Sequence, residues 1–173
     1  MPRIQILALL DGDDRRTIGR SNHVATIVSQ RPKLFPELIK GMWSTNPLVR
    51  MRSADAIEKV TRKHRQLLQP FKKRLLRLMS TTEQQELRWH LAVMVPRLLL
   101  TARERQVAVS SFESYLEDHS SIVKTFALQG LADLAQNHPT IRSQVREILH
   151  AANRTGTPAM KARSRRLLLQ LAS

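Results

Sequence analysis

The chain has 173 residues, of which 42% are hydrophobic and only 4% aromatic, so it is long enough to bury a core built mainly from Leu, Val, Ile and Ala. It contains no Cys, which excludes disulfide bonds, thiolate metal sites and cysteine nucleophiles. Its 29 Lys and Arg residues against 14 Asp and Glu residues give a net charge of +15, which favours an anionic partner and speeds the encounter with one.

The first apolar segment runs from Ile4 to Leu10 and is too short to span a bilayer. The acidic residues Asp11, Asp13 and Asp14 follow it, where a secretory signal would carry a small-residue cleavage site. We therefore expect this segment to be the first helix or cap of the fold, in a soluble, cytoplasmic protein that has no membrane partner.

Helix boundary signals recur along the rest of the chain. Asn46-Pro47 places an N-cap residue before a proline in the first turn, and Thr101 with Glu104 has the spacing of a capping box. Pro96 is expected to kink or end its helix. No run alternates apolar and polar residues, so strands are not expected. In chain order, the predicted helices span residues 15–30, 34–44, 47–62, 67–79, 83–99, 102–117, 121–136, 140–153 and 158–171.

One short pattern returns in every other predicted helix: an apolar residue, a basic residue, and then apolar side chains at helical spacing. Its copies are marked by Val49, Leu87, Val123 and Met160, at spacings of 38, 36 and 37 residues. The apolar positions that follow are expected in the core, and they are Ala54, Ala56, Ile57, Val60, Leu91, Ala92, Val95, Leu98, Ala127, Leu128, Leu131, Leu134, Leu167, Leu168 and Leu171. A steady period of this size predicts helical pairs that stack on their neighbours.

The pattern from Asn46 through Ile57, and again from Ile122 through Leu134, resembles the HEAT-repeat family of armadillo-like proteins. The resemblance implies an all-α, right-handed α-solenoid of about four helical pairs plus a closing helix, in a single domain over residues 1–173. It also implies that the second helix of each pair lines the concave side, and that the protein is an interaction scaffold. The approximate repeats are residues 13–45, 46–80, 82–118 and 120–154, with the closing helix at 157–172.

Two stretches carry nearly all of the excess positive charge. Residues 46–79 hold ten basic and two acidic residues, a net charge of +8, and residues 142–166 hold seven basic residues and one acidic residue, a net charge of +6. The section between them is close to balanced. An uneven field of this kind concentrates anionic partners near the basic stretches.

The basic residues divide into two groups. The repeat has a basic position of its own, which HEAT-like proteins commonly use to tie a helix start to the neighbouring repeat, and a structural role is expected there. That position is held by Arg50, Arg88, Lys124 and Lys161. Basic residues on or leading into second helices are better candidates for binding, because such helices stack side by side along the concave surface. The turn after the 47–62 helix adds a cluster suited to phosphate or an acidic peptide. The candidate binding residues are Lys33, Lys40, Arg62, Lys63, Arg65, Lys72, Lys73, Arg77, Arg103, Arg105, Arg142 and Arg146.

Catalysis is poorly supported by the sequence. There is no glycine-rich phosphate loop, and the six His residues never have the i, i+4 spacing of a helical metal pair, so we expect no catalytic residue, metal or cofactor. Certain HEAT-like proteins are alkylpurine DNA glycosylases, which gives a third, enzymatic hypothesis that would involve Trp89 and Asp133. Trp43 and Trp89 are instead expected to pack between repeats.

Two binding hypotheses are left open by these patterns. The leading one is a non-enzymatic scaffold whose basic concave face binds an acidic protein or peptide. Its rival is a module that binds nucleic-acid phosphates without reading sequence, and a duplex is favoured because scarce aromatic side chains argue against stacking on single-stranded bases. We expect a monomer, or a weak dimer through the closing helix, because Leu167, Leu168 and Leu169 are consecutive and cannot all face inward.

Overall fold

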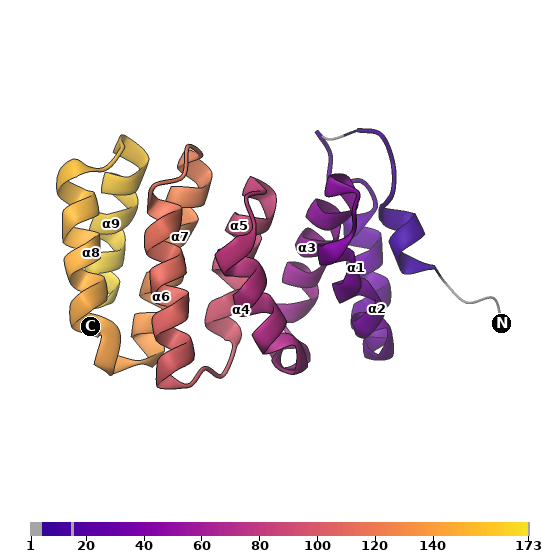
Figure 1. Cartoon of the computed structure of the whole chain (residues 1–173), viewed down its shortest axis with the longest axis horizontal. Helices are drawn as coiled ribbons and strands as arrows, with labels where there is room; N and C mark the ends of the chain where they lie inside the picture. The colour runs from indigo at the N-terminus through magenta and orange to yellow at the C-terminus, as the bar shows by residue number, and fades with distance from the viewer. Residues whose placement is uncertain (1–4, 15, 173) are drawn as a thin grey trace. The chain divides into compact units, whose positions relative to one another are not determined.

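The computed structural model describes residues 5–14 and 16–172, and every regular element in this part of the chain is helical. The predicted all-α class is therefore confirmed. The α-helices are α1 (Ser21–Gln30), α2 (Phe35–Lys40), α3 (Pro47–Thr61), α4 (Lys72–Thr81), α5 (Gln85–Met94), α6 (Ala102–Leu116), α7 (Ser121–Asn137), α8 (Arg142–Thr155) and α9 (Pro158–Gln170) (Figure 1). Short 3₁₀ segments are η1 (Ile6–Leu10), η2 (Pro32–Leu34), η3 (Gly41–Trp43), η4 (Arg65–Phe71), η5 (Val95–Arg97) and η6 (Pro139–Ile141). Within the described ranges, no helix combines the length and the apolar character needed to cross a membrane.

Most helices begin and end where the sequence predicts. The backbone N–H of Leu48 donates to the side chain of Asn46 at 2.9 Å, so Asn46 caps α3. Thr101 and Glu104 form the expected capping box at the start of α6. Pro96 falls in η5, and regular α-helix stops just before that segment. Local capping chemistry thus sets these boundaries.

Four predicted helices are shorter than expected, among them the one predicted at 83–99, which is α-helical only over Gln85–Met94 because it stops before Pro96. The helix predicted at 15–30 begins only at Ser21, because residues 16–20 form turns and Gly19 has a left-handed φ of +51° (residue 15 lies outside the described residues). The helix predicted at 34–44 is α-helical only over α2, with 3₁₀ turns on both sides. The helix predicted at 67–79 opens as η4 and becomes α4 at Lys72, because Pro70 removes a backbone donor from its first turns.

The described chain forms two compact units, one that extends to Lys72 and one that begins at Lys73. In the first unit α3 is central, because it packs against α1, α2 and the 3₁₀ segments η1, η3 and η4. The large apolar side chains buried in this unit include Ile6, Leu10, Val24, Val28, Phe35, Leu38, Ile39, Met42 and Ile57.

A buried arginine fastens the segment before α1 to α3. Arg52 is only 4% exposed, and its guanidinium donates four hydrogen bonds to backbone carbonyls. The acceptors are the carbonyls of Leu10, Asp11, Asp14 and Thr17, at 3.0, 3.0, 2.8 and 3.4 Å. Gly19 permits this close wrapping, since a Cβ there would lie 2.6 Å from Arg52 Cζ.

In the second unit α7 is central. It packs against α5, α6, α8 and α9, and α8 packs against α9. Within this unit α5, α7 and α9 lie on one side and α4, α6 and α8 on the other (Figure 1). The helices approach most closely at Gly130, where a Cβ would lie 2.5 Å from the ring of Phe112 and 2.7 Å from the carbonyl oxygen of Ala92. Any side chain at Gly130 would push α7 away from α5 and α6.

The repeated apolar positions are buried, as the sequence predicts. Val49, Leu87, Val123 and Met160 are 6, 1, 0 and 7% exposed. The apolar positions that follow each of them are buried as well, apart from Leu168, which is half-buried. Leu169 is 75% exposed, so one of the three consecutive leucines does face outward.

Candidate anion-binding groove

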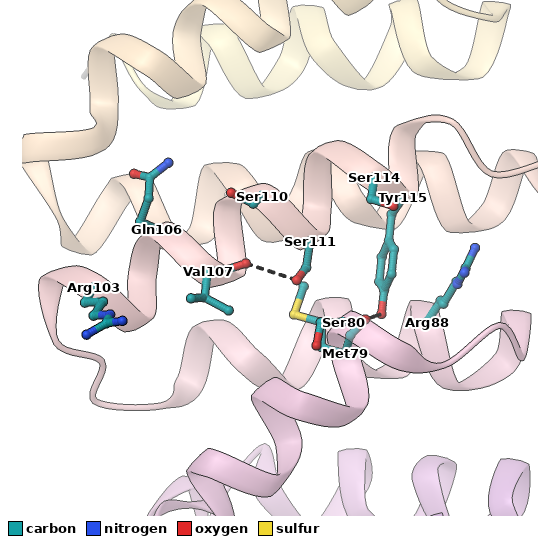
Figure 2. A pocket seen from close by; sticks show the side chains of 10 residues that line it. All are labelled: Met79, Ser80, Arg88, Arg103, Gln106, Val107, Ser110, Ser111, Ser114 and Tyr115. Atoms are coloured by element: carbon teal, nitrogen blue, oxygen red, sulfur yellow. Dashed lines mark hydrogen bonds between the residues drawn. The ribbon is translucent and has the colours of Figure 1, made fainter.

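The second unit carries a groove between α4 and α6, which Figure 2 shows from close by. Its volume is about 470 Å³. The side chains that line it are Met79, Ser80, Arg88, Arg103, Gln106, Val107, Ser110, Ser111, Ser114 and Tyr115. Four of the ten are serines, two are arginines and none is acidic, so the lining offers hydrogen-bond donors to an anionic or polar ligand.

Tyr115 fixes the position of α6 against α4. Its hydroxyl donates to the carbonyl of Met79 at 2.7 Å (Figure 2), and the residue is 2% exposed. Burial raises the pKa of the Tyr115 phenol and the Asp118 carboxylate adds to the rise, while the nearby Arg88 charge acts in the opposite direction. The phenol therefore stays protonated at neutral pH and acts as a donor that joins the two helices.

The charge of Arg88 is already neutralised. Its guanidinium forms an ion pair with Asp118, lies 5.2 Å from the centre of the Tyr115 ring, and donates through Nε to the carbonyl of Thr82 at 2.8 Å. Burial raises the pKa of Asp118, but the hydrogen bond from the Ser120 N–H and the charge and hydrogen bond of the Arg88 guanidinium lower it by more. The pKa of Asp118 therefore lies below its ordinary value. Arg88 therefore helps to shape the groove without offering it a free positive charge.

The open side of the groove is one face of α6. Arg103, Gln106, Ser110 and Ser114 are exposed and follow each other at intervals of three or four residues, which places them in one row along the helix. Within the described part of the chain, none of these four side chains makes a hydrogen bond or ion pair. Val107 lies in the same row and is 43% exposed. The row thus combines one free cation, three free polar groups and one apolar contact.

The opposite side of the groove belongs to a strongly basic helix. Residues 72–81 of α4 contain four basic residues and no acidic one. Lys73, Arg74 and Arg77 are exposed, and Arg77 precedes the lining residue Ser80 by one helical turn. The field near the groove is therefore positive even though only Arg103 offers it a free charge directly.

A second basic patch lies on α8. Arg142, Ser143, Arg146, Glu147 and His150 line a shallow depression of about 390 Å³. Arg146 is exposed, whereas Arg142 is half-buried and donates to the carbonyl of Gln136 at 3.4 Å. Glu147 reduces the positive charge here, so this depression is less suited to an anion than the α4–α6 groove.

The remaining candidate residues belong to the first unit. Lys33 and Lys40 are exposed on η2 and at the end of α2. Lys63 and Arg65 are exposed after α3, and Lys63 lines a depression of about 470 Å³ together with residues of α1. Arg62 is paired with Glu58 at 2.6 Å, which raises the pKa of Arg62 through the hydrogen bond and the negative charge. Lys72 is the last residue of this unit and is half-buried.

Four arginines near helix starts donate to a backbone carbonyl five or six residues earlier in the chain. Arg50 donates to the carbonyl of Ser44 at 2.8 Å, and Arg105 donates to that of Leu100 at 2.7 Å. Arg88 and Arg142 make the equivalent bond to carbonyls six residues earlier. Arg105 and Arg142, which the sequence places among the binding candidates, thus make the same kind of local contact as Arg50 and Arg88. The tie to a neighbouring repeat that the resemblance implies for Arg50 and Arg88 is a different contact and stays a prediction.

The residues of the enzymatic hypothesis lie outside the groove. Asp133 on α7 accepts a hydrogen bond from Gln129 Nε2 at 2.8 Å, and Gln129 in turn accepts one from Arg163 Nη1 at 2.9 Å. Burial raises the pKa of Asp133, against the lowering effects of the Gln129 hydrogen bond and of the charges of Arg97 and Arg163. Trp89 is half-buried on α5, and its ring centre lies 5.7 Å from that of His90. Within the described ranges, no three His, Asp or Glu residues are grouped so as to hold a metal ion.

Most of the side chains that line the groove are not among the candidate residues predicted from the sequence. Its serines, Gln106 and Val107 recur every three or four residues between 103 and 114, which is a signal of one helix face. The sequence does not say which helix packs beside that face, so the groove itself could not be inferred.

No family model matches this chain, and no curated protein matches it. The resemblance to HEAT repeats therefore stays a prediction from the repeated pattern. The structure has one regularity that is typical of repeats, since several side-chain hydrogen bonds join residues about one repeat length apart in the sequence. Tyr115 to Met79 spans 36 residues, Lys59 to Asn22 spans 37, and Arg163 to Gln129 spans 34.

Proposed function

We propose that this protein is a non-enzymatic scaffold of HEAT-like helical repeats that holds an acidic segment of a partner protein against its second helices. The single observation that carries the proposal is the groove between α4 and α6, whose lining has free donors and no acidic side chain. The basic α4 beside it adds charge complementarity to an acidic partner.

The stacked arrangement is supported by bonds at the repeat spacing. The hydrogen bonds at separations of 34, 36 and 37 residues lie close to the intervals of 36 to 38 residues between the repeated apolar positions. Such bonds are expected where equivalent positions of neighbouring repeats come together, and they occur within each of the two units.

Duplex nucleic acid is the second candidate, favoured by the net charge of +15 and by the exposed Lys63 and Arg65. The groove lining favours a polypeptide over it. A duplex presents phosphates and sugars on its outside, so it would leave Val107 without an apolar contact. A protein segment supplies both carboxylates and apolar side chains.

Fluorescence anisotropy tests this proposal with two labelled probes, a polyglutamate peptide and a duplex of about 20 base pairs, in about 50 and 200 mM salt. We expect polyglutamate to bind, and the duplex to bind more weakly and to be displaced by polyglutamate. A duplex that binds tightly, loses roughly a hundredfold in affinity over this salt range and resists polyglutamate would replace the proposal with the nucleic-acid function.

A pair of matched variants locates the binding surface. Arg77→Ala with Arg103→Ala removes two exposed charges beside the groove, whereas Arg165→Ala with Arg166→Ala removes two exposed charges from α9. Both double variants lower the net charge by the same amount. We expect only the first to weaken polyglutamate binding, and an equal loss in both would show that the groove is not the site.

A further inference from the structure

The groove between α4 and α6 has two unlike ends. Figure 2 places Arg103 at one end, Arg88 at the other, and Val107, Ser111 and Met79 between them. The Arg103 side chain is exposed and makes no hydrogen bond or ion pair within the described residues. The Arg88 guanidinium is neutralised by Asp118. Arg103 can therefore bind an anion directly, whereas Arg88 would first have to give up its ion pair with Asp118.

The charges on α6 strengthen this difference. Glu113 and Glu117 are exposed at the end of α6 that carries Ser114 and Tyr115. Near Arg103 the acidic neighbour is Glu104, whose carboxylate accepts the backbone N–H of Thr101 at 2.8 Å as part of the capping box. An acidic ligand group is therefore attracted at the Arg103 end and repelled at the Tyr115 end.

The middle of the groove offers an apolar contact. Val107 is 43% exposed and supplies this contact, whereas Met79, which also lines the groove, is only 1% exposed (Figure 2). A leucine-sized side chain that covers this contact gains roughly 25 cal/mol for each Å² of apolar surface removed from water. The free hydroxyls of Ser110 and Ser114 lie in the same row and are suited to hydrogen bonds with the backbone of an extended segment.

The length of the groove sets the length of its ligand. Arg103 and Tyr115 are twelve residues apart on α6, which corresponds to about 18 Å along the helix axis. An extended chain rises about 3.3 Å per residue, so a segment of five to six residues covers this distance.

We propose that the groove recognises an extended segment of a partner protein with acidic side chains at one end, an apolar side chain in the middle and uncharged residues at the other end. This inference rests on the proposed scaffold function and adds to it the pattern of the bound segment. The acidic end lies at Arg103, the apolar side chain lies on Val107, and the uncharged end lies at Ser114 and Tyr115.

Three labelled peptides test this pattern by fluorescence anisotropy at about 50 mM salt. The first is Glu-Glu-Ser-Leu-Ser-Ser-Ser, the second replaces its Leu by Ser, and the third is Glu-Glu-Ser-Leu-Ser-Glu-Glu. We expect the first to bind about tenfold more tightly than the second, because the second lacks the apolar contact. We expect the third to bind no more than about twofold more tightly than the first, although it carries twice as many acidic side chains.

Matched variants connect these preferences to the groove. Val107→Ser should remove the preference for the leucine peptide, whereas Ile122→Ser, which changes a side chain 52% exposed on α7, should keep it. Equal binding of the first two peptides, or much tighter binding of the third, would overturn the pattern and leave a general cationic surface. If none of the three peptides binds the wild-type protein, and polyglutamate does not bind either, the scaffold function fails together with the pattern.

Discussion

Arg52 in the first unit and Arg88 in the second are helical arginines that are satisfied in different ways. Arg52 donates to four backbone carbonyls, and within the described residues no carboxylate pairs with it. Arg88 is paired with Asp118, and its ion pair has side-chain exposures of 21 and 5%. One cation is surrounded by neutral dipoles, and the other is half of an ion pair.

The difference determines which groups lose a partner when each arginine is replaced. Without Arg88, the buried carboxylate of Asp118 loses its counter-charge, which is costly in a site shielded from water. Without Arg52, the carbonyls that it binds remain neutral. Residues 11–14 and 16–20 are exposed, so several of these carbonyls can be hydrated instead. The two units thus depend on buried cations to different degrees.

The largest effect is expected for Arg88→Met. The variant leaves Asp118 unpaired and should lower the free energy of unfolding by about 3 kcal/mol, measured by urea denaturation at pH 7. Adding Asp118→Asn removes the orphaned charge and keeps an acceptor for the Ser120 N–H. The double variant should therefore recover a large part of the loss. A double variant no more stable than Arg88→Met alone would mean that packing on Tyr115, and not charge, is what Arg88 provides.

A smaller effect is expected for Arg52→Met. The variant loses four hydrogen bonds to neutral carbonyls, some of which water replaces, so we expect a loss of about 2 kcal/mol by the same measurement. Limited proteolysis should show faster cleavage before α1, because Arg52 holds that segment to α3. A loss larger than that of Arg88→Met would contradict the contrast between the two arginines.

The pH dependence of stability compares Asp118 with Asp133. The pKa of Asp118 is lowered by folding, so its contribution is present above the ordinary value of 3.8 and is lost as the pH falls through the lower folded value. The pKa of Asp133 is raised by burial, so the sign is reversed and the folded protein gains stability as the pH falls through the raised value. Urea denaturation from pH 7 to pH 3 should therefore show that the free energy of unfolding falls less steeply with decreasing pH in Asp118→Asn than in the wild-type protein. In Asp133→Asn it should fall more steeply than in the wild-type protein. Identical pH profiles for the two variants would refute this assignment.

The periodic apolar positions and the helix caps could be predicted from the sequence, because each depends on residues close together in the chain. Val123 and Leu131, for example, occur at the helical spacing that a buried face requires, and both are fully buried. The role of Arg105 could not be predicted, because it depends on whether the carbonyl of Leu100 lies within its reach. The groove was also beyond prediction, since its lining combines side chains from three helices. Contacts between segments far apart in the sequence determine which side chains line the groove, whereas local sequence patterns determine where the helices begin and end.

The smallest effects on stability are expected for Arg103 and Arg105, which differ in how their charge is used. Arg105 is half-buried and donates to Leu100 at 2.7 Å, so Arg105→Ala should lower the free energy of unfolding by about 1 kcal/mol. Arg103 is exposed, so Arg103→Ala should change the free energy of unfolding by less than about 0.5 kcal/mol.

Their effects on binding should be reversed. Arg103→Ala removes the free charge of the groove and should weaken polyglutamate binding several-fold in the anisotropy assay, whereas Arg105→Ala should leave the affinity close to that of the wild-type protein. The two variants remove the same charge two residues apart, so a general loss of positive charge predicts equal losses of affinity for both. Unequal losses in the expected direction can arise only if the position of the charge matters, because net charge and residue type are matched. Equal losses would show that an arginine bound to a backbone carbonyl still attracts the acidic ligand, and the distinction between structural and binding arginines would then have to be abandoned.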